Sequence, residues 1–169
     1  MGGVRMLFIC NSLNQLSFGK LMAVYEEGNR ENAAYFYAGM DKNAALLQAE
    51  QDFYAYLEDC FYKTLGAFYG IWIENGEYVS ALRMEPYRDG LLLEALETAP
   101  AHRRMGFASR LLKAVLSDVS APVYSHVKKD NVASLRTHAA CGFVQINDSA
   151  DMIDGTISDR HLTLRWDSF

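Results

Sequence analysis

Apolar residues along the chain occur either in short continuous runs or at helical spacing, and the two patterns alternate. Runs at residues 4–10, 67–74 and 78–83 predict strands. Asn75-Gly76 lies between the last two runs and predicts a hairpin, because both residues of such a turn must take positive φ angles.

Two blocks with helical spacing of apolar residues precede this hairpin. The first block predicts a helix over residues 12–27 that stops at Gly28. The second block predicts a helix over residues 43–63, capped by Asn43, with a wide apolar and aromatic stripe. Residues 33–40, between the blocks, fit either a helix or a loop.

The second half of the chain is organised around an apolar strand at residues 91–98 and an amphipathic helix at residues 108–119. Another strand is expected at residues 123–128. Because a helix separates these two strands, they should be parallel and joined by a right-handed crossover. The remaining expected elements are a helix at residues 131–141 and strands at residues 143–146 and 161–166. The pattern predicts an α/β (α+β) domain with a mixed sheet.

Composition and charge restrict the class of protein. The 169 residues are half apolar and 22% charged, which predicts one globular domain over residues 1–169. A net charge of −5 argues against a nucleic-acid partner. Cys10, Cys60 and Cys141 form no C-x-x-C pair, which favours reduced thiols. We find no apolar segment of membrane-spanning length and no signal peptide, so we expect a cytoplasmic protein without a membrane partner.

A basic, glycine-containing loop, Arg103-Arg104-Met105-Gly106-Phe107-Ala108, joins the central strand to its helix. The first N–H groups of a helix have no intrahelical acceptor, and the helix dipole makes that end positive. Arginine side chains add charge that suits phosphate oxygens, and Gly106 leaves room for a close approach. The loop therefore predicts a pyrophosphate site. The alternative is an ordinary connection with two solvated arginines.

Two motifs on either side of the central helix resemble the GNAT superfamily of N-acetyltransferases. Arg-x-x-Gly-x-Ala in the basic loop is similar to the superfamily's acyl-CoA pyrophosphate loop. The second motif consists of Asn131, Ser134, His138 and Gly142-Phe143. The resemblance covers about residues 91–143. It implies a mostly antiparallel seven-stranded sheet with helices on both faces. It also implies that the strands at 91–98 and 123–128 splay apart to admit a pantetheine arm.

The resemblance further implies an acetyl-CoA-dependent N-acetyltransferase that moves an acetyl group to a primary amine by direct attack in a ternary complex. Acetyl-CoA (coenzyme A) would be the co-substrate, a small-molecule amine or a peptide N-terminus the acceptor, and no metal would take part. Backbone N–H groups of Leu96 and Thr98 would bind the thioester oxygen. The residues expected along the coenzyme are Leu96, Thr98, Arg103, Arg104, Met105, Gly106, Phe107, Ala108, Ser109, Asn131 and Ser134. The sequence leaves open whether the protein forms a homodimer.

Glu94 is the preferred general base. A lysine-like amine has a pKa of about 10.4 and must lose a proton before it can attack. A carboxylate inside an apolar strand needs a reason, although an exposed strand-face glutamate or an ion pair would also account for it. Strict alternation puts Glu94 and Glu97 on opposite faces, and a bulge would change that phase.

His138 stands where the superfamily usually has tyrosine, whose hydroxyl is thought to protonate the departing sulfur. A histidine can also donate a proton, so we expect His138 as the general acid. The alternative is a helix histidine that hydrogen-bonds locally. A nucleophilic pair with Cys141 is conceivable, but a buried structural thiol is favoured. Similarly, Asn131 is a good N-cap whether or not it also lies along the coenzyme.

A competing hypothesis is a non-catalytic acyl-CoA-binding or interaction module of the same fold, since histidine in place of tyrosine suggests a lost acid. Kinases and dinucleotide oxidoreductases are disfavoured, because neither of their glycine-rich phosphate motifs occurs. Aromatic residues of the first half, such as Phe53 and Tyr56, are expected to pack a core, and part of them to wall an acceptor groove.

Overall fold

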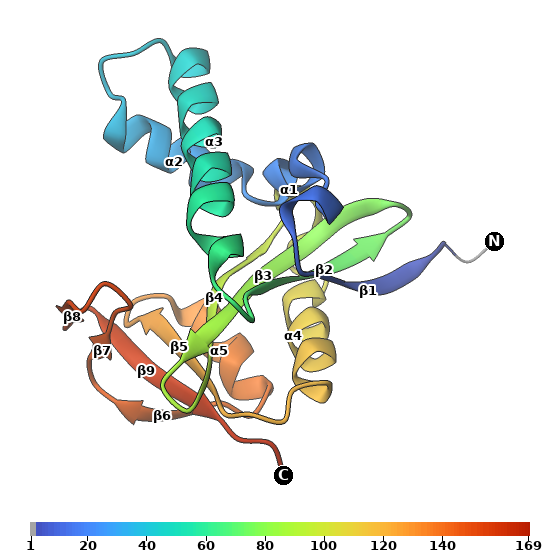
Figure 1. Cartoon of the computed structure of the whole chain (residues 1–169), viewed down its shortest axis with the longest axis vertical. Helices are drawn as coiled ribbons and strands as arrows, with labels where there is room; N and C mark the ends of the chain where they lie inside the picture. Colours follow the sequence, from blue (N-terminus) through green and yellow to red (C-terminus); the bar gives the residue numbers. More distant parts are fainter. Residues whose placement is uncertain (1–2) are drawn as a thin grey trace.

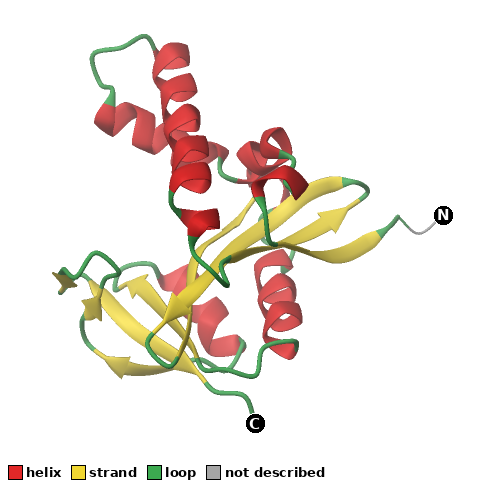
Figure 2. Cartoon of the chain, viewed as in Figure 1, coloured by secondary structure: helices red, strands yellow, loops and turns green. Residues whose placement is uncertain are grey.

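The computed structural model describes residues 3–169, so Met1 and Gly2 of the expected domain lie outside it. Its helices and strands are labelled in Figure 1 and coloured by type in Figure 2. In chain order they are β1 (Arg5–Cys10), α1 (Phe18–Val24), α2 (Glu26–Phe36), α3 (Lys42–Asp59), β2 (Phe68–Glu74), β3 (Glu77–Tyr87), β4 (Gly90–Thr98), α4 (Phe107–Ser117), β5 (Val123–Lys128), α5 (Val132–Ala140), β6 (Val144–Asn147), β7 (Ala150–Asp151), β8 (Ile157–Ser158) and β9 (His161–Trp166).

Seven strands form one sheet in the order β1-β2-β3-β4-β5-β9-β6. Every neighbouring pair is antiparallel except β4 and β5, which are parallel. The predicted mixed, mostly antiparallel sheet is therefore confirmed. The connection from β6 to β9 contains a small separate hairpin, β7–β8, which the hydrophobic pattern did not predict.

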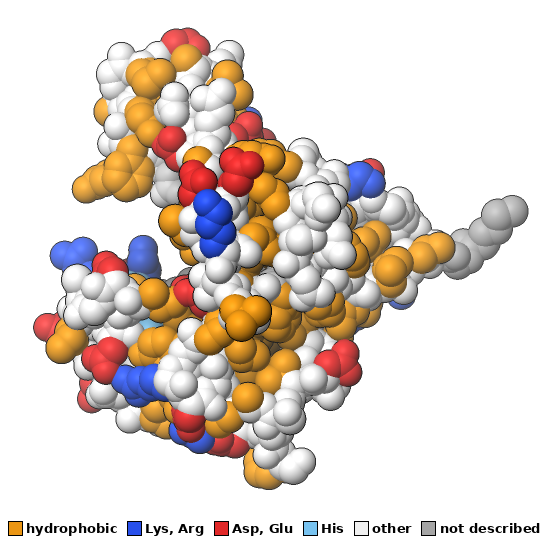
Figure 3. Space-filling view, in the orientation of Figure 1, with side chains coloured by type: hydrophobic (Ala, Val, Ile, Leu, Met, Phe, Trp, Pro, Cys, Tyr) orange, Lys and Arg blue, Asp and Glu red, His pale blue; other side chains and the backbone are white. Residues whose placement is uncertain are grey.

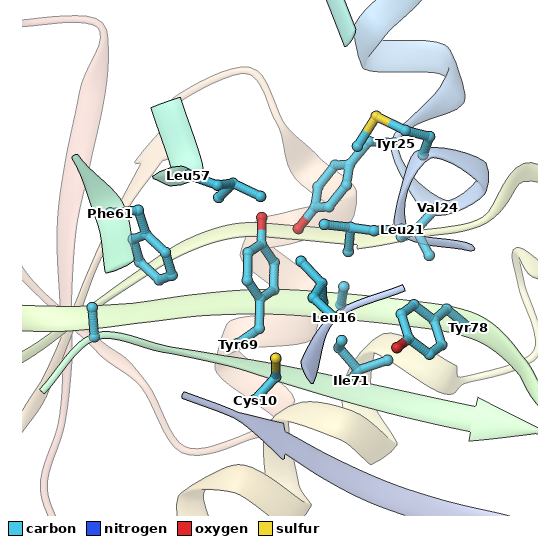
Figure 4. Close-up of a cluster of buried hydrophobic side chains, with 13 residues drawn as sticks. Cys10, Leu16, Leu21, Val24, Tyr25, Leu57, Phe61, Tyr69, Ile71 and Tyr78 are labelled. Carbon is cyan, nitrogen blue, oxygen red and sulfur yellow. The ribbon is translucent and has the colours of Figure 1, made fainter. Parts of the chain in front are cut away.

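Two apolar clusters cover the two faces of this sheet. One cluster packs α1 and α3 against β2 and β3, and Figure 4 shows its central side chains, including Tyr25 and Tyr69. The other packs α4 and part of α5 against the opposite face, around Leu82 and Leu111. Helices α2 and α3 project from the sheet as an arm (Figure 1). None of the helices in residues 3–169 is long and apolar enough to cross a membrane.

The predicted first helix is wrong in its extent. A 3₁₀ turn and α1 end before Tyr25, whose φ and ψ of −94° and 14° break the helix, and α2 then starts at Glu26. Gly28, the predicted stop, lies inside α2 because tertiary packing overrides its low helix propensity. Residues 33–40 contain the end of α2 and a turn.

The predicted cap of α3 is also wrong by two residues. Asp41 is the N-cap, and its carboxylate accepts hydrogen bonds from the N–H groups of Asn43 and Ala44. Further on, β3 continues through Pro86 to Tyr87. The chain reverses at Arg88, with a φ of 51°.

Gly90 allows β4 to begin beside the chain that enters β5. A Cβ atom at Gly90 would lie 2.0 Å from the carbonyl oxygen of Pro122, which accepts a hydrogen bond from the N–H of Leu91. We expect Gly90→Ala to lower the free energy of unfolding by about 1–3 kcal/mol, because backbone must move to relieve the overlap. Urea denaturation measures this change.

Gly19→Ala is the matched control, because a Cβ atom on this α1 residue meets nothing within 4 Å. Alanine should leave stability unchanged or raise it by up to about 1 kcal/mol there. Equal midpoints for wild type and Gly90→Ala would contradict the close contact at β4.

Candidate active site

A β-bulge divides the central strand β4. Between the pairs Ala81–Glu97 and Arg83–Glu94, two β4 residues face one residue of β3. Ala95 lies in the bulge with a φ of 49°, and its carbonyl oxygen accepts a hydrogen bond of 2.7 Å from the Tyr25 hydroxyl. The extra residue brings Glu94 and Glu97 to the same face of β4. Strict alternation predicted opposite faces, which is wrong because the bulge changes the phase of the strand.

The two parallel strands separate just before this bulge. Residues 91–93 pair with residues 123–125, and no pairing continues to Thr98 and Lys128 at the strand ends. A cleft of about 390 Å³ lies in the gap and is lined by both strands and by α5. The strands at 91–98 and 123–128 thus splay apart, as the resemblance implied.

The basic loop ends in an open helix N-terminus. Gly106 is the N-cap of α4, with a φ of 79°, and no side chain caps this end. A Cβ atom on Gly106 would meet nothing within 4 Å, so the turn faces open space. A groove of about 660 Å³ runs along the loop and the first turn of α4 to the N-terminus of α5.

All the residues predicted to lie along a coenzyme line this groove except Met105, whose side chain is exposed and outside it. The two arginines differ. Arg103 pairs with Glu27 of α2, and its Nε–H donates to the Thr98 carbonyl. Arg104 has no ion-pair partner in the described part of the chain, so its charge faces the groove uncompensated.

Glu94 is held in a poorly hydrated position. Its Oε2 atom is buried without a hydrogen-bond partner and lies 3.8 Å from Nε of Arg83. Burial raises the pKa of Glu94 to about 7, although Arg83 acts to lower it. Burial also raises the pKa of Glu97, which Arg103 opposes. Glu94 is therefore a partly ionised carboxylate at neutral pH.

His138 is almost fully buried, with 1% of its surface exposed. Its Nδ1 lies 2.7 Å from the Ser134 carbonyl oxygen, so Nδ1 carries the proton and donates it. Its Nε2 lies 2.9 Å from Oγ of Ser125 and accepts from that hydroxyl. Burial lowers the pKa of His138. This geometry favours the local hydrogen-bonding alternative over the predicted general acid.

Asn131 of the second motif and Cys141, which precedes its Gly142, also have structural roles. Cys141 is buried, its Sγ faces the Ser109 carbonyl at 3.8 Å, and burial raises its thiol pKa. The Asn131 side chain accepts from the Ser134 N–H at 3.1 Å, so it caps α5 while it lines the groove. Ser125, whose hydroxyl contacts His138, was not predicted as a site residue, because no motif surrounds it in the sequence.

A third cavity of about 450 Å³ lies between the arm and the bulge. Glu97 lines all three cavities, so they meet beside β4. Phe53 and Tyr56 of α3 line this third cavity, as predicted for part of the aromatic residues, and Arg83 lines it as well. The available signal for Arg83 was its position between two apolar residues of a strand. In residues 3–169 no cluster of His, Cys, Asp and Glu is arranged to bind a metal.

Comparison with known proteins decides the family. The model of the Acetyltransferase (GNAT) family matches residues 24–143. The chain belongs to the GNAT family. The match contains the arm, the bulge, the basic loop and α5, which together surround the three cavities. A comparison with curated protein sequences gives no match.

Solved structures of GNAT proteins share the fold at low sequence identity. An acetyltransferase of the family from Bacillus cereus is 15% identical, with 99% of each chain covered and a TM-score of 0.62. The ribosomal-protein-S18-alanine N-acetyltransferase of Escherichia coli is 15% identical over 95% of this chain and 92% of that one, with a TM-score of 0.59. The Paia N-acetyltransferase of Thermoplasma acidophilum, in complex with coenzyme A, is 11% identical over 96% and 99%, with a TM-score of 0.58.

The buried ring of His138 makes a prediction about stability and pH. Unfolded histidine titrates near pH 6.5, whereas the native ring resists protonation, so the unfolded state binds more protons as the pH falls through that value. The stability that His138 provides is therefore full above about pH 7 and declines below it.

We expect the free energy of unfolding of wild type to exceed that of His138→Gln by about 1–3 kcal/mol at pH 7.5 and by less at pH 5.5. Urea denaturation at both values tests this expectation. A larger gap at pH 5.5 would mean that the native ring is protonated, as an acid role requires.

Proposed function

We propose that the protein is an acetyl-CoA-dependent N-acetyltransferase that transfers an acetyl group to a primary amine by direct attack in a ternary complex. The observation that supports this proposal best is the meeting of three cavities at Glu97. One cavity starts at an open helix N-terminus, one occupies the gap between the splayed strands, and one lies under the arm. They suit a diphosphate, a thioester and an acceptor amine respectively.

The diphosphate of coenzyme A would rest against the first turn of α4. The free N–H groups and the helix dipole attract anions there, and Gly106 presents no side chain to block them. Arg104 supplies the uncompensated charge, while Arg103 is partly engaged by Glu27. Asn131 and Ser134 would line the path toward the splay.

The acetyl end would lie beside the bulge in β4. Beyond residue 93 the edge of β4 that faces β5 has no strand partner. We assign the N–H groups of Leu96 and Thr98 to the thioester oxygen, because donors fixed before the reaction stabilise the developing oxyanion.

Glu94 would accept the proton of the amine. The nitrogen attacks the carbonyl carbon, a C–N bond forms, the C–S bond breaks, and the proton lost by nitrogen goes to the carboxylate. A pKa of about 7 suits a general base at neutral pH. The sulfur would leave as a thiolate. Thiols are far more acidic than alcohols, with a pKa of about 8.5 for cysteine, so this departure is feasible without a buried acid. We assign His138 to positioning Ser125 and not to donating a proton to sulfur.

Substitution at Gly106 tests the phosphate site. We expect Gly106→Asn to weaken acetyl-CoA binding at least about tenfold, because a side chain would enter the space beside the α4 amides. Asparagine tolerates a positive φ angle better than most residues, which limits the strain. Isothermal titration calorimetry measures the affinity.

Gly76→Asn is the matched control. Gly76 has a φ of 82°, also faces open space and lies in the β2–β3 hairpin turn. It should show a similar loss of stability with unchanged affinity. Unchanged affinity of Gly106→Asn would remove the diphosphate from this turn.

Substitution at Glu94 tests the base. We expect kcat/KM to rise with pH through about 7 in wild type, because the carboxylate must be ionised to accept a proton. Glu94→Gln should lower kcat by about 10²–10⁴-fold and abolish that rise, while acetyl-CoA still binds. Release of free thiol from acetyl-CoA with a panel of amines provides the assay.

Glu97→Gln is the comparison, since Glu97 lies on the same face of β4. A larger loss in Glu97→Gln than in Glu94→Gln would transfer the role of base to Glu97. Tight binding of acetyl-CoA without turnover of any amine would favour the non-catalytic module.

A further inference from the structure

The third cavity has a buried arginine on its wall. The Arg83 side chain is only 15% exposed, and its Nε–H has no hydrogen-bond partner in residues 3–169. A buried donor without a partner costs stability, and the cost is larger for a charged group. Glu94 compensates part of the charge from 3.8 Å, but the Nε–H donor is left without a hydrogen bond from the described chain.

Aromatic rings hold this guanidinium in place. Its central carbon lies 5.0 Å from the ring centre of Tyr56, 5.8 Å from that of Phe61 and 5.9 Å from that of Phe53. Such contacts stabilise the charge through the ring faces, and they leave the N–H groups at the edge of the guanidinium available as hydrogen-bond donors. The planar fork is therefore ordered in advance and suited to a carboxylate.

Acidic residues near Arg83, including the buried Glu85, make no hydrogen bond with its Nε–H. Asp52 accepts hydrogen bonds from Tyr37 and from Gln48. Glu97 lies 4.0 Å from Arg103. Glu94 is the nearest carboxylate, but its 3.8 Å separation from Nε is too long for a hydrogen bond.

We propose that Arg83 binds a carboxylate group of the acceptor, so that the acceptor is an amine of the amino-acid class. This inference rests on the proposed function. Phe36, Phe53 and Tyr56 line the same cavity and provide apolar surface for the rest of such a molecule. In Figure 3 hydrophobic side chains of the arm overhang a notch in the surface.

A carboxylate at this position would also act on the base. Glu94 and Arg83 face each other across β3 and β4, and Arg83 lowers the pKa of Glu94. An acceptor carboxylate that neutralises Arg83 would remove part of this effect. Glu94 would then hold a proton more strongly once the correct acceptor is bound, which strengthens it as a base.

Matched pairs of amines test the proposal: phenylalanine with phenethylamine, and leucine with isopentylamine. The members of each pair differ only in the carboxylate. We expect wild type to prefer the amino acid by about 10–100-fold in kcat/KM, as for a bidentate charged contact. Arg83→Gln should reduce this preference to within about threefold, and Arg83→Lys should retain part of it.

Arg88→Gln is the control variant, because Arg88 lies outside the cavity and pairs with Asp151. It should keep the full preference. A second measurement does not depend on turnover: in the presence of coenzyme A, phenylalanine should raise the melting temperature of wild type and of Arg88→Gln but not of Arg83→Gln.

Equal use of both members of each pair by wild type, or a preference for the amine without a carboxylate, would overturn the proposal. So would a preference that survives in Arg83→Gln. These outcomes differ from failure of the proposed function, in which acetyl-CoA alone leaves the melting temperature unchanged. Should Arg83→Gln not fold, the wild-type preference and the melting-temperature shift still decide.

Discussion

The hydrogen bond from the Tyr25 hydroxyl to the Ala95 carbonyl links the two halves of the molecule at its most irregular point. Ala95 holds a positive φ angle, which costs energy in a residue with a Cβ atom, and the buried ring of Tyr25 stabilises it from the helical side. The bulge brings Glu94 and Glu97 to the same face of β4. It lies directly after Leu93, where pairing between β4 and β5 ends, so both carboxylates stand beside the cleft between the two strands.

The polar groups of the site are of two kinds: some have no hydrogen-bond partner within residues 3–169, and others are fully hydrogen-bonded. On the side where we place the coenzyme, open helix amides and Arg104 are left for an anion to satisfy. Beside the bulge, Glu94 and Arg83 lie 3.8 Å apart without a hydrogen bond, so we infer that each keeps part of its charge for a substrate. By contrast, the polar atoms of His138 are all satisfied within the protein, which makes this ring part of the scaffold.

Local sequence signals predicted most of the strands and the basic loop. Apolar runs, the Asn75-Gly76 turn and Gly106 at the start of α4 each determine the conformation of the residues next to them. The same signals failed where distant packing decides. Gly28 lies inside a helix, and the alternation of Glu94 and Glu97 depends on a bulge that Tyr25 stabilises from 70 residues away. Burial of His138 follows from Ser125 on another element, so the motif alone suggested an acid that the packing disfavours.

The arm has a small core of its own. Ala33, Ala45 and Ala49 bring α2 and α3 together, with Tyr37 beside them, apart from the two clusters that cover the sheet. Phe36, an exposed residue of α2 that lines the third cavity, can therefore change without repacking the sheet, whereas Phe53 of α3 packs against the sheet cluster. The tip of the arm thus has packing of its own, separate from the sheet on which we place the coenzyme, so substitutions there can alter one without disturbing the other.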